Sequence, residues 1–337
     1  MDAFIAGPDR ILRIGHAFQE AKVLLSAVEL GLFTAIAKEP LDGATLCKRI
    51  SVDPRGGRDF FDALVAIGLL ERDEDGRYAN TLETALYLDR YRASYIGCEL
   101  EFLNAQLYER WNFLTPALRT GKAQTGAGAA GNYPARYADQ GNLEMFVKAM
   151  TAQSLAVARA LAMKFPWRHY KTVIDIGGAQ GCLPLQLVRV HSHLIGGCFD
   201  LPALNVTFDR YVREGGGSDR LRFYPGDFLQ DPLPAAEVLV MGRVLHNWDL
   251  ATKKMLLTKA YAALPVGGAL VVYERLIDDE RRVNASGLLA SLNMLVMTAG
   301  GFDFTGADCV GWMREAGFSN MRVEPLTGGQ SMVVGTK

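Results

Sequence analysis

The first residues that could bind a ligand form a glycine-rich turn, Asp175-Ile-Gly-Gly-Ala-Gln-Gly181. Such a turn between a strand and a helix lets a ligand approach the backbone at the carboxyl edge of a sheet. It has neither the Gly-x-Gly-x-x-Gly spacing of a dinucleotide site nor the Gly-Lys-Ser/Thr of a phosphate loop. Since no Lys, Arg, Ser or Thr lies between Gly177 and Leu183, the turn indicates a nucleoside ligand without phosphates, or merely a tight connection.

Polar residues also follow the next two predicted strands. Asp200 comes about 20 residues after the turn, where such folds bind the two ribose hydroxyls. Further on, Asp227 can accept a hydrogen bond from an exocyclic amine, and Phe228 can cover an adenine ring. Each feature alone could be a helix cap or a turn. Because all three fall at the tips of consecutive strands, they predict an adenosine site.

These positions need a sheet whose strands end at one edge. From Thr172 onward, short β-rich runs alternate with helical stretches, which predicts an α/β fold with a mostly parallel, doubly wound sheet and helices on both faces. Segments around Val323 and Met332 fit further strands. The expected parallel strands are 172–176, 194–199, 221–224, 237–241 and 269–273.

The N-terminal part has a different pattern. Residues 10–37 predict a long helix with an apolar stripe, broadened by apolar residues that would pack against a second subunit or inside a monomeric domain. Two helical segments within 41–70 and a hairpin at Asp75-Gly76 then predict a winged-helix module. Its second helix lacks the Arg/Lys face that enters a major groove, which favours a scaffold or dimerisation role over DNA reading.

Composition narrows the choice of partners. The 337 residues include 36 Lys and Arg against 37 Asp and Glu, a balance that argues against work on nucleic acid or anionic lipid. No signal peptide or membrane span is apparent, so we expect a cytoplasmic protein without membrane or nucleic-acid partners. The five scattered cysteines form no Cys-x-x-Cys pair, and we expect no metal.

The order of these motifs resembles that of S-adenosylmethionine-dependent O-methyltransferases of the caffeate and acetylserotonin type, which include bacterial natural-product members. The family's patterns are a glycine turn after Asp, Asp-Leu-Pro, Gly-Asp-Phe, Arg-x-Leu-His-Asp-Trp, a Glu that closes the fifth strand, and Ser-Leu-Asn-Met-Leu. The matching segments here are Asp175 to Gly181, Asp200-Leu-Pro202, Gly226-Asp-Phe228, Arg243-Val-Leu-His-Asn-Trp248, Tyr273-Glu274 and Ser291-Leu-Asn-Met-Leu295.

The resemblance covers nearly the whole chain and implies a homodimer that methylates a hydroxyl of a small aromatic or secondary-metabolite acceptor. It implies a Rossmann-like methyltransferase sheet preceded by a helical winged-helix dimerisation domain. We expect the dimerisation domain over 1–105, a helical linker and substrate-pocket segment over 106–165, and the S-adenosylmethionine-binding domain over 166–337.

The resemblance also implies a role for individual residues. His246 would be the general base, oriented by two acids, Glu274 and Asp303. The residues that would face the acceptor or the methyl group are Phe146, Met150 and Asn293. The residues that would contact S-adenosylmethionine are Tyr137, Ser154, Gly177, Asp200, Gly226, Asp227, Phe228 and Arg243.

Elementary chemistry supports the role of His246. A phenol with a pKa of about 10 is mostly protonated at pH 7, yet methyl transfer needs an electron-rich oxygen. A neutral imidazole in contact with the hydroxyl can take its proton as the new bond forms, which contributes typically 10²–10⁴-fold to the rate. The alternative is a structural histidine at a strand end.

Two positions depart from the family pattern. Asn247 stands where the family usually has Asp, and Ala179 replaces a common loop glycine. The first change removes a negative charge beside the base and leaves open methylation of carbon or nitrogen, or a non-methylating reaction. A winged-helix regulator that senses a nucleoside is the alternative from another class of protein.

Overall fold

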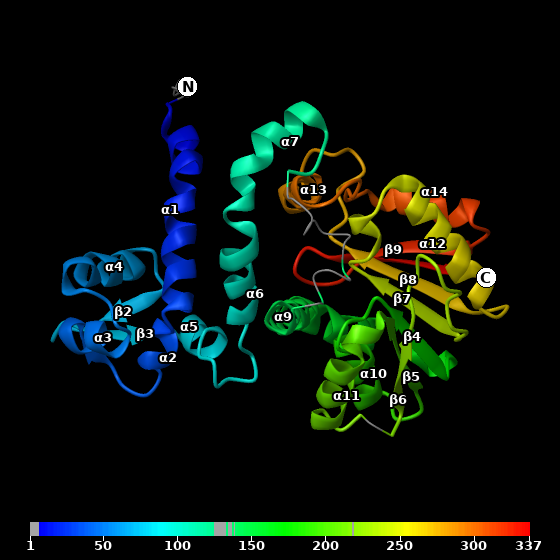
Figure 1. Cartoon of the computed structure of the whole chain (residues 1–337), viewed down its shortest axis with the longest axis horizontal. Coiled ribbons are helices and arrows are strands. Elements are labelled where there is room, and N and C mark those ends of the chain that lie inside the picture. Colours follow the sequence, from blue (N-terminus) through cyan, green and yellow to red (C-terminus); the bar gives the residue numbers. More distant parts are fainter. Residues whose placement is uncertain (1–6, 125–132, 134–136, 138, 218) are drawn as a thin grey trace, which may run out of the picture. The chain divides into compact units, whose positions relative to one another are not determined.

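The computed structural model describes residues 7–124, 133, 137, 139–217 and 219–337. The chain divides into two compact units, Met1–Glu109 and Arg110–Lys337 (Figure 1). Among the residues described, no helix is both long and apolar enough to cross a membrane. The domain boundaries expected at 105/106 and 165/166 stay predictions.

The first unit begins with helix α1 (Asp9–Glu29), which is shorter than the helix predicted over 10–37. It ends because Gly31 adopts a left-handed conformation with φ of 68°, after which a short second helix starts. The exposed residues Ile11, Ile14 and Phe18 lie on its first half, whereas Leu25 and Val28 are buried. The helices of this unit are α1, α2 (Leu32–Ala35), α3 (Gly43–Arg49), α4 (Pro54–Ala66), α5 (Leu82–Tyr87), α6 (Gly97–Phe102) and the π-helical turn η1 (Leu103–Leu107).

The two helical segments and the hairpin predicted next are present as α3, α4 and the strands β2 (Leu70–Arg72) and β3 (Arg77–Asn80). A third short strand, β1 (Leu41–Asp42), completes a sheet in the order β1-β3-β2. Phe61 of α4 packs against Tyr78 of β3 with ring centroids 5.3 Å apart, inside the apolar core of the unit. Assignment of these elements to the winged-helix class stays a prediction.

The second unit contains a seven-stranded sheet in the order β6-β5-β4-β7-β8-β10-β9. Neighbours from β6 to β8 pair in parallel, and β10 pairs antiparallel with β8 and β9, so the predicted α/β fold is confirmed. Each predicted parallel strand lies within one residue of its observed bounds. The strands are β4 (Thr172–Ile176), β5 (Ile195–Asp200), β6 (Leu221–Pro225), β7 (Val238–Gly242), β8 (Ala269–Glu274), β9 (Ser319–Pro325) and β10 (Ser331–Thr336).

Helices cover both faces of this sheet (Figure 1). Side chains of α9, α10 and α11 join one apolar core with Val173 and Val240, while those of α12 and α14 join the other core with Ile174 and Leu239. Alternate residues of each strand thus enter opposite cores. The helices are η2 (Arg110–Phe113), α7 (Leu114–Thr120), α9 (Gln140–Lys164), η3 (Trp167–His169), α10 (Cys182–Val190), η4 (Pro202–Leu204), α11 (Asn205–Glu214), η5 (Leu245–Asn247), α12 (Leu250–Ala263), α13 (Ala285–Met297) and α14 (Gly306–Glu315).

The strand order reverses at β4, whose two neighbours are β5 and β7. In doubly wound sheets a ligand crevice forms at this reversal, outside the carboxyl ends of the strands. The carboxyl ends of β4, β5, β7 and β8 lead to Gly177, Asp200, Arg243 and Glu274, respectively. The fold therefore gathers residues that are about 100 positions apart along one edge.

Close packing at the turn after β4 makes a testable prediction about stability. A Cβ atom at Gly181 (φ 84°) would lie 2.6 Å from the Phe208 ring, whereas one at Gly267 (φ 82°) would meet nothing within 4 Å. Both Gly→Ala changes carry the left-handed backbone cost, but only Gly181→Ala adds overpacking. Denaturant unfolding should show Gly181→Ala to be less stable than Gly267→Ala by about 1–3 kcal/mol. Equal losses would contradict the packing argument.

Candidate active site

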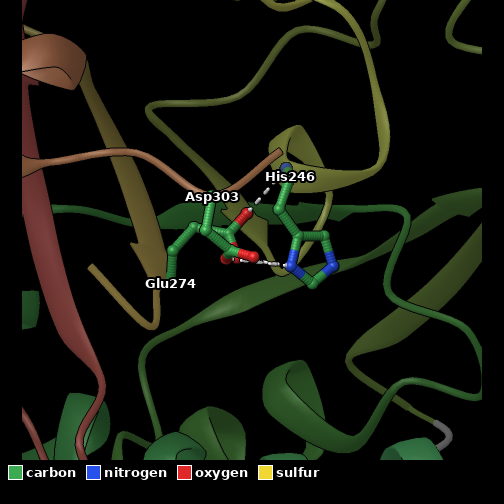
Figure 2. Close-up of side chains that lie close together, drawn as sticks. All are labelled: His246, Glu274 and Asp303. Atoms are coloured by element: carbon green, nitrogen blue, oxygen red, sulfur yellow. Dashed lines mark hydrogen bonds and ion pairs between the residues drawn. The ribbon is translucent and has the colours of Figure 1, made fainter. Parts of the chain in front are cut away.

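His246 lies in the short turn η5 after β7, beside two buried carboxylates (Figure 2). Its Nδ1 atom is 3.4 Å from Glu274 Oε2 at the end of β8 and 3.4 Å from Asp303 Oδ1 in the loop before α14. The His246 backbone N–H also donates to Glu274 Oε1. Both acids are 1% exposed in their side chains, against 12% for the imidazole. Figure 2 shows the other ring nitrogen, Nε2, on the side away from both carboxylates.

Burial and charge oppose each other at this triad. Burial lowers the pKa of His246, but the charges of Glu274 and Asp303 outweigh it, so that the pKa is raised above 6.5. Burial raises the pKa of Glu274 to about 7, although the imidazole and Arg243 act against this. The pKa values of His246 and Glu274 are therefore both raised, and the two groups are coupled through their charges.

The turn that carries His246 has an unusual backbone. Arg243 is left-handed with φ of 57°, a conformation that costs free energy for any residue other than glycine and recurs at functional sites. The Asn247 side-chain amide donates to the backbone carbonyls of Arg243 (3.1 Å) and Val244 (3.3 Å). An ionised aspartate has no N–H to donate, so the departure at this position gives the turn two hydrogen bonds.

The predicted adenosine residues meet at the sheet edge. Gly177 is left-handed with φ of 72°, and a Cβ atom there would lie 2.8 Å from the Val244 side chain. The buried Asp200 carboxylate accepts from the backbone N–H groups of Ala179 (2.9 Å) and Leu201 (2.8 Å). Desolvation raises the pKa of Asp200 to about 6, although these hydrogen bonds lower it.

The residues of the segment after β6 differ in the contacts that they make within the protein. The Asp227 carboxylate already accepts from the Leu229 backbone N–H (2.9 Å) and from Gln230 Nε2 (3.0 Å). At Gly226 a Cβ atom would lie 2.5 Å from the Phe199 ring, so this glycine is required for packing against β5. Phe228 is half-buried and meets Trp248 edge to face at 5.8 Å.

Helix α9 brings its predicted residues to the ends of β7 and β8. Met150 Sδ lies 3.9 Å from an Arg243 guanidinium nitrogen. Ser154 forms a side-chain hydrogen bond with the buried Tyr273. Burial is the main cause of the raised pKa of Tyr273. Ser154 thus has a protein partner next to the glutamate of the triad.

Aromatic rings form a second group near the triad. Tyr137 and Phe146 are buried with ring centroids 5.8 Å apart, and both lie near Tyr133. Tyr133 is in turn 6.4 Å from Trp248. Tyr133 and Trp248 were not predicted as site residues, because an aromatic residue in sequence gives no sign of which ring it will face.

Asn293 of α13 accepts a hydrogen bond from Trp111 Nε1 at 3.1 Å. On the same helix, Ser291 Oγ accepts from the backbone N–H of Asp303. Helix α13 is therefore bonded to the loop that carries one acid of the triad. Trp111 was also not predicted, since 182 positions separate it from Asn293.

Ligand atoms of His246, Glu274 and Asp303 lie within 4.8 Å of one another, a spacing that a metal ion could also use. The two acids also act electrostatically on a buried lysine, Lys253, which supplies a positive charge to this part of the fold. The group thus joins one imidazole, two buried carboxylates and a buried ammonium group.

The chain matches the O-methyltransferase domain over residues 111–319 and the O-methyltransferase dimerisation domain over residues 12–90. It is 40% identical over 333 residues to the tetracenomycin polyketide synthesis 8-O-methyl transferase TcmO of Streptomyces glaucescens, covering 99% of this chain and 98% of that protein. It is 38% identical over 291 residues to the N,N-dimethyltransferase OxyT of Streptomyces rimosus, covering 86% and 84%.

The fold of this chain is also similar to that of solved structures. Human N-acetylserotonin methyltransferase in complex with S-adenosylmethionine superposes with a TM-score of 0.92 at 26% identity, covering 100% of this chain and 99% of that chain. The match extends over both units.

The geometry of the triad makes a prediction about the titration of His246. Asp303→Asn keeps a side chain of the same size but removes a charge that raises the imidazole pKa. The pKa of His246, measured by NMR on labelled histidines, should be above 6.5 and should fall by about one unit in the variant. The other four histidines serve as internal controls. An unchanged His246 titration would mean that Asp303 does not hold the imidazole.

Proposed function

Because the chain belongs to the O-methyltransferase family, we propose that it methylates a hydroxyl of a small aromatic acceptor with His246 as the general base. It is an S-adenosylmethionine-dependent O-methyltransferase of the secondary-metabolite type. One observation supports this proposal above all: His246 Nδ1 lies 3.4 Å from the buried carboxylates of both Glu274 and Asp303.

The residues at the sheet edge fit S-adenosylmethionine. Each Asp200 oxygen accepts one backbone N–H, and a carboxylate has room for further donors such as ribose hydroxyls. Gly177 lets its turn pack directly against Val244, and the backbone of this turn would line the cofactor. Phe228 would cover the adenine, and Gly226 and Asp227 would shape the turn beside it. Tyr137, Ser154 and Arg243 would contact the cofactor from the α9 side. When bound, S-adenosylmethionine supplies a sulfonium methyl group that an electron-rich oxygen can displace.

The triad determines which atom of His246 acts. With Nδ1 engaged by the acids, the neutral imidazole carries its proton on Nδ1 and has a free electron pair on Nε2. Nε2 therefore takes the proton of the acceptor hydroxyl. The acids stabilise the imidazolium that results, because their charges favour the protonated ring.

The acceptor class follows from the rings and from the relatives. Tyr133, Phe146 and Trp248 form a group of aromatic side chains suited to a flat ring system. The buried Trp248 Nε1 has no hydrogen-bond partner among the described residues, so a ligand oxygen would satisfy it. Phe146, Met150 and Asn293 would complete the acceptor side. Since TcmO is named for polyketide synthesis, we favour a phenol of an aromatic polyketide.

An amine acceptor is the second candidate, because one relative of 38% identity is named an N,N-dimethyltransferase. The same imidazole can take a proton from an ammonium nitrogen as well as from a phenol. Asn247 is compatible with either reaction, since its amide bonds to the backbone of the turn.

We further propose that the protein is a homodimer through its first unit. Residues 12–90 match a dimerisation domain, and α1 exposes Ile11, Ile14 and Phe18 at 75%, 62% and 58%. Apolar side chains this exposed on one helix are typical of an interaction surface.

Turnover tests the reaction and the role of His246. Incubation with labelled S-adenosylmethionine and a panel of phenols, indoles, polyketides and matched amines, read by mass spectrometry, should give O-methylated products. His246→Ala should lower kcat by at least about 10² with little change in cofactor affinity, because the base acts in the transition state. Wild-type kcat/KM should rise with pH as the imidazole loses its proton, and the variant should lack this rise.

Acidic phenols, which are ionised already, should suffer least from His246→Ala. The exposed His169→Ala serves as the control. Full activity of His246→Ala on a neutral phenol with the same pH profile would contradict the assignment of the base. Products methylated only on nitrogen would favour the second candidate.

The pH dependence of cofactor binding tests the role of Asp200. With a pKa of about 6 in the free protein, Asp200 is protonated below that pH and no longer accepts from hydroxyls as a carboxylate. Calorimetry should show S-adenosylhomocysteine binding about tenfold weaker at pH 5 than at pH 7. Asp200→Asn should weaken binding by about 1–3 kcal/mol and remove this dependence, whereas exposed Asp209→Asn should not. Unchanged binding by Asp200→Asn would remove the ribose assignment.

The mass of the protein in solution tests the homodimer. Light scattering at micromolar concentration should give twice the chain mass of 36.9 kDa. Placing charges on α1 with Ile14→Glu and Phe18→Glu should shift the mass toward one chain, while Val266→Glu, at a position 91% exposed on the other unit, should not. A wild-type mass near 36.9 kDa would contradict the dimer.

A further inference from the structure

Lys253, on α12 directly after the segment that carries His246, is fully buried at 0% exposure. Burial of a lysine is costly unless its charge is balanced. Its Nζ donates to the backbone carbonyl of Trp248 at 2.5 Å. This hydrogen bond ties the ammonium group to the chain two residues after His246.

Two rings on the Asp303 loop enclose the same ammonium group. Nζ lies 3.4 Å from the centroid of the Phe302 ring and 5.7 Å from that of Phe304. A cation over an aromatic face is attracted by the ring quadrupole, most strongly when desolvated. The residue between these rings, Asp303, is one of the two acids on His246. One buried cation thus contacts both the turn of His246 and the loop of Asp303.

Acidic groups balance this charge. Burial lowers the pKa of Lys253 to about 8, and the charges of Glu274, Asp303 and Asp249 act against this lowering. Lys253 is therefore mostly protonated at pH 7. The carboxylates that hold His246 are also those that keep the lysine charged.

We propose that Lys253 is a positioning residue for the proposed base, whose buried cation balances Glu274 and Asp303 and fixes the Asp303 loop against the turn of His246. This inference deepens the proposed function, because it rests on His246 as the base. It assigns a role to a side chain that contacts neither reacting group.

The electrostatic consequence follows from the charges that face the cluster. These are His246 and Arg243 after β7, Glu274 on β8, Asp303 before α14, and Lys253 with Asp249 at the start of α12. The thiol of Cys309 on α14 is also near Glu274. Removing one positive charge makes the cluster bind protons more tightly. Without Lys253 the imidazole would stay protonated to a higher pH, so less of it would be free to accept a proton.

A purely structural role predicts something else. Replacement of a buried ion by an apolar side chain of similar size is often neutral or stabilising. Lys253→Met would then leave both the fold and the titration of His246 as they are. Titration of His246 therefore distinguishes the two roles, and it needs no turnover.

The test compares Lys253→Met with the wild-type protein by NMR titration of labelled histidines. We expect the pKa of His246 to rise by about one unit or more in the variant, with S-adenosylhomocysteine binding retained. Lys254→Met is the matched control, since the neighbouring Lys254 is half-exposed and pairs with Glu315 at 2.7 Å away from the triad. An unchanged pKa of His246 in a folded Lys253→Met protein would overturn the proposal.

The wild-type protein supplies a second measurement that holds even if the variant does not fold. The His246 signals should show a further small step near pH 8, where Lys253 loses its proton. Their constancy between about pH 7.5 and pH 9 would also overturn the proposal.

Turnover separates this inference from the proposed function. If both hold, the kcat/KM profile of Lys253→Met moves to higher pH by the same amount as the NMR titration, and activity recovers at high pH. If the NMR titration moves and the activity profile does not, Lys253 controls the charge of His246, but His246 is not the base.

Discussion

The contact on which the site depends is that of His246 Nδ1 with two buried carboxylates, each at 3.4 Å. Burial alone would lower the pKa of the imidazole and raise that of Glu274, so both groups would tend to be neutral. Their mutual attraction reverses this for the histidine, whose pKa is raised. The pair of acids also fixes the tautomer, because Nδ1 must carry the proton that faces them.

Three separate parts of the chain must meet for this contact to form. The turn after β7 brings His246, the end of β8 brings Glu274, and the loop between α13 and α14 brings Asp303. Parallel pairing of β7 with β8 places the first two at one sheet edge. Asp303 is held in two ways. Its backbone N–H donates to the Ser291 hydroxyl, and the neighbouring rings of Phe302 and Phe304 pack against the Lys253 ammonium group. The polar cluster is thus fixed by an apolar sheet core that excludes water on both faces.

Departures from the family pattern at this edge have local explanations. Asn247 donates to two carbonyls of a strained turn, where an ionised aspartate could not. Ala179 is left-handed with φ of 51°, and its N–H donates to Asp200. A glycine there would adopt the same backbone more easily. In the first unit, Gly31 ends α1 early, so the long helix predicted over 10–37 was wrong beyond Glu29.

The sequence by itself determined the sheet and the edge of the site. Strand runs from 172 to 273 are rich in apolar residues, and Gly177, Asp200, Phe228, His246 and Glu274 lie within a few residues of their carboxyl ends. Only the tertiary structure decided which of these side chains touch and which other residues join them. Trp111, Tyr133, Trp248 and Lys253 were missed, because aromatic and lysine side chains read as ordinary core or surface residues until packing gives them neighbours. The charge of a buried group depends on those neighbours, which lie up to 57 positions away at His246, so no local pattern encodes it.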